Sequence, residues 1–134
     1  MNIETNHQII NASREEVYNF LIDMNNFEEL FPKDKIDNWS ATEETCSLKI
    51  KSMGQIGLKR VASTPNLLIY LDSYGKSPFK FTLNIYLSEK ENGSEVYLDF
   101  DGDINPFMKM MVEKPLTEFF NGIVKRLAKK YLSF

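Results

Sequence analysis

Apolar and polar residues alternate in short runs through the middle of this chain, from residue 35 to residue 103. In the clearest run, apolar side chains fall at every second position: Phe79, Phe81, Leu83, Ile85 and Leu87. A second run follows after Asn92-Gly93 and places Val96, Leu98 and Phe100 on one side. A period of two is typical of a strand with one buried face, and Asn-Gly favours a tight turn. The two runs therefore predict a β-hairpin.

Five further strands are predicted from the same period. Residues 2–10 form the first, with Ile3, Thr5, His7 and Ile9 on one face. The other four lie at residues 36–41, 46–50, 56–60 and 67–73, separated by polar or Gly- and Pro-containing turns. Successive strands joined by short turns favour an antiparallel meander.

Two short helices are predicted between the first and second strands. Ser13 followed by Glu16 forms a capping box for one of them. Asn25 with Glu28 repeats the signal, and Pro32 ends the second helix.

Residues 105–134 predict one long helix. Asn105 is a good N-cap and Pro106 suits the first helical position. Apolar residues then recur at three- and four-residue steps, with Pro115 and Gly122 as interruptions. We expect Pro115 to remove one amide donor and to break or kink the helix. The helix would be roughly 40 Å long at 1.5 Å per residue.

This order of elements predicts an α+β fold in a single domain covering residues 1–134. A curved, seven-stranded antiparallel sheet would grip the long C-terminal helix, because only that helix is long enough to cover the apolar face of the sheet. A sheet that curves around a helix tends to leave a hollow, so we expect an apolar cavity between the two.

Composition narrows the functional classes. The chain has 134 residues, 43% hydrophobic and 13% aromatic, with a net charge of −3. Acidic and basic residues are interspersed, so a nucleic-acid partner is not expected. Cys46 is the only cysteine. The first residues do not resemble a signal peptide, and no apolar run is long enough for stable membrane insertion. These features predict a cytoplasmic protein.

Three regions resemble the START-like superfamily, also called SRPBCC or polyketide cyclase-like, which has the helix-grip fold. They are residues 11–23 at a strand-to-helix junction, residues 27–32 at the second helix and its proline, and the strand ending at Asp103 before the helix from Pro106. The resemblance spans nearly the whole chain and implies a ligand cavity between the sheet and the last helix. It transfers no catalytic residue, since the sequence carries no activity-defining motif of that superfamily.

Candidate site residues follow from these faces. The predicted cavity wall consists of Phe79, Phe81, Leu83, Leu98, Phe100, Met108, Met111, Val112, Leu116 and Phe119. Arg60 and His7 are the predicted polar groups that orient a ligand, because each shares a face with apolar neighbours. Asp99, Asp101 and Asp103 lack the spacing of a calcium loop, and no metal or cofactor is expected. Basic residues near the helix end (Lys125, Arg126, Lys129 and Lys130) are explained by the helix dipole.

The leading functional prediction is binding of a hydrophobic or amphipathic small molecule in the cavity. One alternative is a cyclase- or dehydratase-like enzyme that acts on a ring or polyketide-like substrate there. Another is an interaction protein resembling co-chaperones. Oligomeric state is left open by the sequence.

Overall fold

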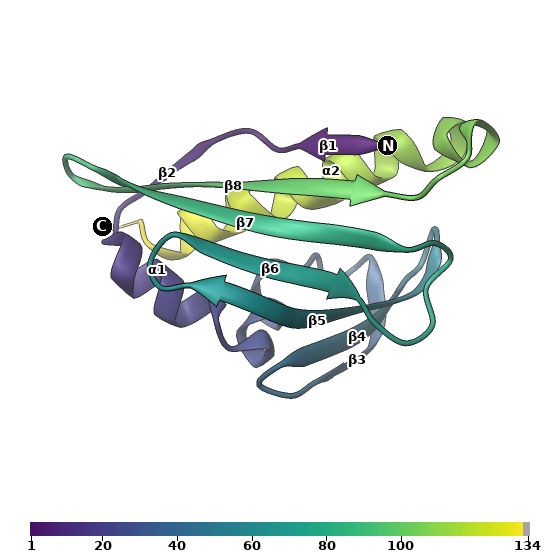
Figure 1. Cartoon of the computed structure of the whole chain (residues 1–134), viewed down its shortest axis with the longest axis horizontal. Helices are drawn as coiled ribbons and strands as arrows, with labels where there is room; N and C mark the ends of the chain where they lie inside the picture. The colour runs from purple at the N-terminus through teal and green to yellow at the C-terminus, as the bar shows by residue number, and fades with distance from the viewer. Residues whose placement is uncertain (133–134) are drawn as a thin grey trace.

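A computed structural model describes residues 1–132 of the chain. Its centre is one curved antiparallel sheet with the order β1-β8-β7-β6-β5-β4-β3, and β2 also pairs with β8 (Figure 1). The strands are β1 (Asn2–Glu4), β2 (Gln8–Ile10), β3 (Ile36–Ala41), β4 (Thr45–Ile50), β5 (Gly54–Thr64), β6 (Leu68–Ser73), β7 (Phe81–Lys90) and β8 (Gly93–Gly102). This confirms the predicted fold class, with the predicted first strand divided in two.

The helices are α1 (Arg14–Leu21), the 3₁₀ helix η1 (Met24–Leu30) and α2 (Pro106–Lys130). The long helix α2 runs behind the sheet in Figure 1 and contacts β2, β8 and η1. Helix α1 contacts β7, β8 and η1. The sheet and the helices therefore enclose one apolar layer, which confirms the helix-grip arrangement.

Side-chain caps explain where the helices begin. The Ser13 hydroxyl accepts a hydrogen bond from the Glu16 amide at 3.1 Å, and Asn105 accepts one from the Met108 amide at 2.8 Å. The predicted cap at Asn25 is wrong, because Asp23 accepts from the Asn25 amide and η1 begins at Met24. Pro115 lies inside α2, which continues through it as one helix, so the predicted break is not seen. The predicted last residues of this helix, 133–134, lie outside the described part.

Aromatic rings fill much of the space between sheet and helix. Phe100 lies 4.9 Å from Phe120 and 5.4 Å from Phe81, measured between ring centroids. Phe79 lies 6.2 Å from Phe100. Phe100 and Phe120 are 2% exposed or less, so these rings form a solid core.

A β-bulge separates β1 from β2. Ile3 pairs with Phe100, and continuing that register would pair Gln8 with Glu95, but Gln8 pairs with Val96. A one-residue slip reverses which side chains face the core. Ile3 and Ile10 are consequently buried, whereas Ile9 is 62% exposed. The predicted strict alternation through residues 2–10 is therefore wrong after Thr5.

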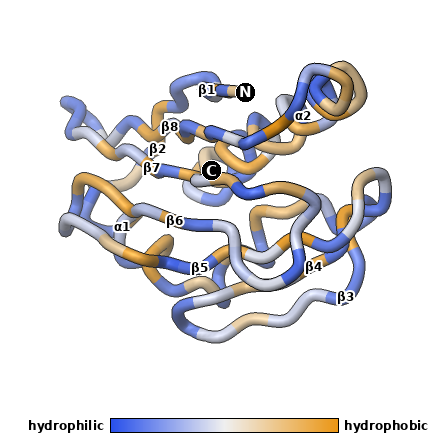
Figure 2. The backbone as a smooth tube through the Cα atoms, turned by 45° about the vertical axis from the view of Figure 1, so that its right-hand side comes forward, coloured by the Kyte–Doolittle hydropathy of each residue, from blue (hydrophilic) through white to orange (hydrophobic). Residues whose placement is uncertain are grey.

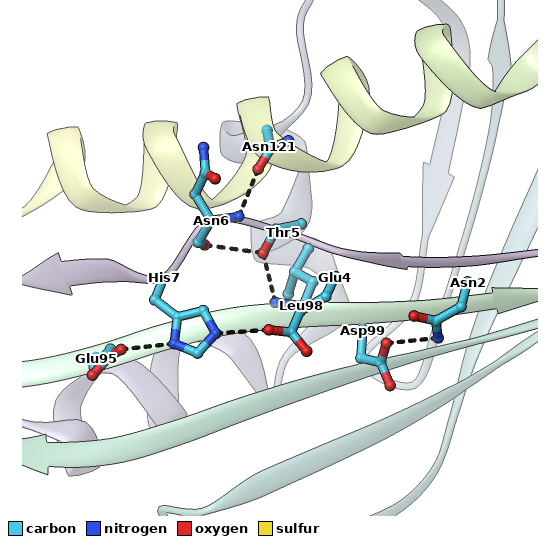
Figure 3. Close-up of polar contacts among 9 residues, drawn as sticks. All are labelled: Asn2, Glu4, Thr5, Asn6, His7, Glu95, Leu98, Asp99 and Asn121. Atoms are coloured by element: carbon cyan, nitrogen blue, oxygen red, sulfur yellow. Dashed lines mark hydrogen bonds and ion pairs between the residues drawn. The ribbon is translucent and has the colours of Figure 1, made fainter.

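Thr5 closes the bulge (Figure 3). Its hydroxyl accepts a hydrogen bond from the Leu98 amide at 2.9 Å, and its own amide donates to the Leu98 carbonyl at 2.9 Å. The next amide, of Asn6, donates to the side-chain oxygen of Asn121 at 2.8 Å. The bulge therefore ties the edge of the sheet to the middle of α2.

Candidate functional site: a cleft beside the C-terminal helix

A cleft of about 400 Å³ opens between α2, the loop after η1, and the turn that joins β4 to β5. Its lining residues come from all three segments: Pro32, Asp34, Lys35, Ile50, Lys51, Ser52, Met53, Lys114, Pro115, Leu116, Glu118, Phe119 and Arg126. Small-molecule sites in proteins commonly have volumes of about 300–1,000 Å³. The volume is thus sufficient for a small ligand.

The floor of the cleft is apolar. Ile50 and Leu116 are 5% and 1% exposed, and Pro32 is also buried. Phe119 is half-buried and its ring lies 5.3 Å from Phe31 and 5.7 Å from Phe120. Phe119 is therefore the side chain at which the cleft meets the aromatic core.

Charged residues lie around this apolar floor. Four cations line the cleft, namely Lys35, Lys51, Lys114 and Arg126, against the two anions Asp34 and Glu118. None of the ion pairs within residues 1–132 involves any of these four cations. The lining is thus net cationic in a protein whose overall charge is −3.

Arg126 is the half-buried member of this cationic set. Long helical side chains point back toward the N-terminus of their helix, which brings the guanidinium over Gly122, one turn earlier. A Cβ atom at residue 122 would lie 2.7 Å from Nη1, so the absence of a side chain there makes room for the guanidinium. Nη1 donates a long hydrogen bond of 3.4 Å to the Leu30 carbonyl.

Two of the predicted wall residues, Leu116 and Phe119, line this cleft. Five others lie in the solid core and are 8% exposed or less: Phe79, Phe81, Leu83, Leu98 and Phe100. Met108 and Val112 are half-buried beside that core, and Met111 is 64% exposed. The predicted wall therefore splits between the cleft, the core and the surface.

Arg60 lies away from the cleft. Its guanidinium donates hydrogen bonds to the carbonyls of Ile22 and Glu43, and it lies 4.0 Å from the Glu44 carboxylate. It thereby joins the end of α1 to the turn between β3 and β4. The prediction that Arg60 faces a ligand cavity with Ile56 and Leu58 does not match this position.

His7 lies on the outer side of the sheet, so its predicted inward orientation is wrong (Figure 3). Its ring stacks on Tyr97 with 4.0 Å between centroids. Nε2 lies 3.0 Å from Glu4 and Nδ1 lies 2.8 Å from Glu95. Hydrogen bonds to Glu4 and Glu95 raise the pKa of His7 above its usual 6.5.

A wider, shallower depression lies at the β6–β7 loop, at the same ends of the strands as the β4–β5 turn but lined by other residues. It has a volume of about 900 Å³ and is lined mainly by polar and charged residues of the β6–β7 loop and the end of β8. Phe79 and Phe81 reach it but stay buried. The depression is more open to solvent, and the cleft beside α2 has the larger apolar share that ligand sites need.

Other shifted groups also lie outside the cleft. Burial raises the pKa of the Cys46 thiol to about 12, which keeps it protonated. Hydrogen bonds from Lys90 and His7 lower the pKa of Glu95.

Within residues 1–132 no three His, Cys, Asp or Glu side chains are grouped as metal ligands would be. In the same range, no helix has the length and hydrophobicity needed to cross a bilayer.

No family model and no curated protein matches the sequence. Solved structures do match over almost the full chain. A START superfamily protein from Mycobacterium smegmatis has a TM-score of 0.70 at 13% identity, covering 97% of this chain and 96% of that one. The fold is START-like.

Two further structures with the START-like fold carry quite different names. One is norcoclaurine synthase from Thalictrum flavum in complex with a transition-state analogue, with a TM-score of 0.74, 9% identity, and coverage of 98% of this chain and 93% of that one. The other is the Aha1 dimer from Colwellia psychrerythraea, with a TM-score of 0.66, 17% identity, and coverage of 98% and 96%. At these identities the likeness shows the START-like fold alone, so function must be argued from the cleft.

Several lining residues were missed in the sequence, notably Arg126 and Lys51. Arg126 was assigned to the basic helix end, where the dipole alone explains a cation. Its spacing of four residues from Gly122 was the available signal, because a glycine one turn before an arginine leaves space for the guanidinium. Lys51 carries no local signal, since its place depends on how the β4–β5 turn meets α2.

Proposed function

We propose that this protein binds a hydrophobic or amphipathic small molecule in the cleft beside α2. The observation that supports this is the combination of a buried apolar floor with a polar rim in a volume of about 400 Å³. Burial of apolar ligand surface contributes about 25 cal/mol per Å². The floor would supply affinity, and the charged rim would orient the ligand.

The START-like fold supports the same proposal. One structure with this fold, norcoclaurine synthase, is in complex with a transition-state analogue, so a small molecule can be held by such a scaffold. Here the ligand would lie against Leu116 and Phe119 of α2 and against Ile50 and Met53 at the β4–β5 turn.

Binding is favoured over catalysis by where the perturbed groups lie. Catalytic acids and bases usually combine a shifted pKa with a position in a cleft. Within residues 1–132, the shifted pKa values belong to His7, Glu95 and Tyr97 on the outer side of the sheet, to Cys46 in the core, and to Tyr131 at the end of α2. These positions favour a binding module over the cyclase-like alternative.

A cleft-filling variant tests the proposal. Met53 is half-buried in the cleft, so Met53→Trp should fill it and weaken binding about tenfold or more. Met110→Trp is the matched control, because Met110 is 86% exposed and is outside the lining. Native mass spectrometry against fatty alcohols, fatty acids and polycyclic aromatics would measure occupancy, and amide chemical shifts would locate the ligand.

The expected result is one ligand per chain in the wild type and in Met110→Trp, with loss in Met53→Trp. Chemical-shift changes should centre on residues 50–53 and 114–119. The proposal fails if the wild type takes up no compound of the panel, or if Met53→Trp binds as tightly as the wild type.

A further inference from the structure

The cleft has a chemical preference that its volume alone does not specify. Its lining combines an apolar floor with four cations, and only two anions share it. Within residues 1–132, the carboxylates lie more than 4 Å from the four cationic groups, so none of these charges is neutralised by a salt bridge. A neutral apolar ligand would leave that charge without a partner.

We propose that the ligand carries a carboxylate and that the Arg126 guanidinium is its anchor. This inference rests on the proposed function and names the class of ligand: a monocarboxylic acid with an apolar body, such as a fatty acid or an aryl carboxylate. The apolar body lies on Ile50, Leu116 and Phe119, and the carboxylate meets Arg126 at the wall of the cleft.

Arg126 suits this role because of how it is held. Its guanidinium has five N–H donors, and within residues 1–132 one of them makes the long contact with the Leu30 carbonyl. That contact and the space over Gly122 fix the planar group in the cleft wall while leaving donors for a bidentate pair with a carboxylate. Half-burial also reduces solvent screening of the charge.

The neighbouring basic residues do not share this geometry. Lys130 pairs with Glu29 at 3.0 Å and lies over the Phe20 ring at 4.6 Å, on the side of α2 that meets α1. Lys125 is exposed and lies outside the cleft lining. Lys35, Lys51 and Lys114 are exposed at the rim, where they add attraction without fixing an orientation.

Decanoic acid and decan-1-ol distinguish this inference from the proposed function, because they share a chain and differ in charge at pH 7.5. Isothermal titration calorimetry on the full chain should show decanoate binding about tenfold or more tightly than decan-1-ol. In Arg126→Gln most of that preference should be lost, leaving only the part due to the rim lysines, with decan-1-ol affinity unchanged. Lys125→Gln removes the same charge from α2 and should keep the preference.

Each outcome decides one of the two proposals. Binding of neither probe at the cleft would overturn the proposed function and this inference together. Equal binding of both probes, or an unchanged preference in Arg126→Gln, would overturn the inference and leave the proposed function standing. Arg126→Lys is a second variant that keeps the charge but cannot form a bidentate pair. If Arg126→Lys bound decanoate as tightly as the wild type does, the assignment of the guanidinium as anchor would also be overturned.

Discussion

The parts of α2 before and after Pro115 both contain many apolar side chains, but they differ in how deeply those side chains are buried. Before Pro115, Phe107, Met110 and Met111 are 76%, 86% and 64% exposed. After it, Leu116, Phe120, Ile123, Val124 and Leu127 are each 4% exposed or less. The first turns extend past the ends of β1 and β8 in Figure 1, and Figure 2 colours part of them toward orange, the hydrophobic end of its scale. An apolar face on a helix therefore does not determine whether anything lies opposite.

The cleft lies where these two parts meet. Pro115, Leu116, Glu118 and Phe119 line it from α2, at the point where the buried part gives way to the extended one. One wall of the cleft is thus firmly held and the other belongs to a less buried segment. We expect the buried part to set the stability of the protein and the transition to set access to the cleft.

The largest effect should come from the buried part of the helix. Phe120→Ala removes a ring that is 2% exposed and packs against Phe100, so the free energy of unfolding should fall by about 3–5 kcal/mol. Phe107→Ala removes the same ring from the extended part and should change it by about 0.5 kcal/mol or less. Urea unfolding followed by circular dichroism compares the two. Similar losses of stability in the two variants would contradict the division of α2 into a buried and an extended part.

Amide hydrogen exchange should show the same division without mutation. Amides of residues 120–127 lie over the core and should exchange at least about tenfold more slowly than those of residues 109–114. Decanoate or another cleft ligand should slow exchange around residues 114–119 most. Uniform protection along α2 would show that the extended part is as stable as the rest.

Asn121→Ala should have a moderate effect. It removes the acceptor for the Asn6 amide at the bulge, which costs up to about 1 kcal/mol of stability because part of that bond is replaced by water. Lys125→Ala, one turn later and exposed, is the control and should be near neutral. Two-dimensional NMR spectra should show the change spreading to residues 5–8. If the chemical-shift changes were confined to α2, the proposed link between the bulge and α2 would be contradicted.

The smallest effect should be a pH dependence of stability that arises at His7, on the outer side of the sheet just after the bulge. The pKa of His7 is raised by Glu4 and Glu95, so its stabilising contribution is complete below the pKa of an unfolded histidine, near 6.5. That contribution is lost as pH rises through the raised pKa of the folded state. The urea midpoint should therefore fall slightly between pH 6 and pH 8.5. His7→Gln should abolish the part of the change that is due to this site.

Element types and most boundaries could be predicted from the sequence because alternation and helical spacing are local. The Ser13 and Asn105 caps and the β7–β8 hairpin follow from residues next to one another. His7 could not be placed, because a single bulge at Thr5 reverses the faces of everything after it in the strand. Strict alternation cannot bury both Ile9 and Ile10, so this adjacent apolar pair was the sequence signal of the bulge.

The site was predicted less well than the fold, for a physical reason. Inward-facing residues such as Leu83, Leu98 and Phe100 were assigned to a cavity wall, and in the structure they fill the space themselves. Whether a layer of large side chains closes or leaves a void depends on its total volume and on how closely the helix approaches. Neither quantity is encoded in the periodicity of one strand.

One consequence concerns Trp39, the only tryptophan of the chain. Its indole lies 5.4 Å from the ring of Phe31, which in turn lies 5.3 Å from Phe119 in the cleft wall. A molecule that moves Phe119 will change the surroundings of the indole through this short series of contacts. We therefore expect tryptophan emission to report whether the proposed ligand occupies the cleft, without any added label.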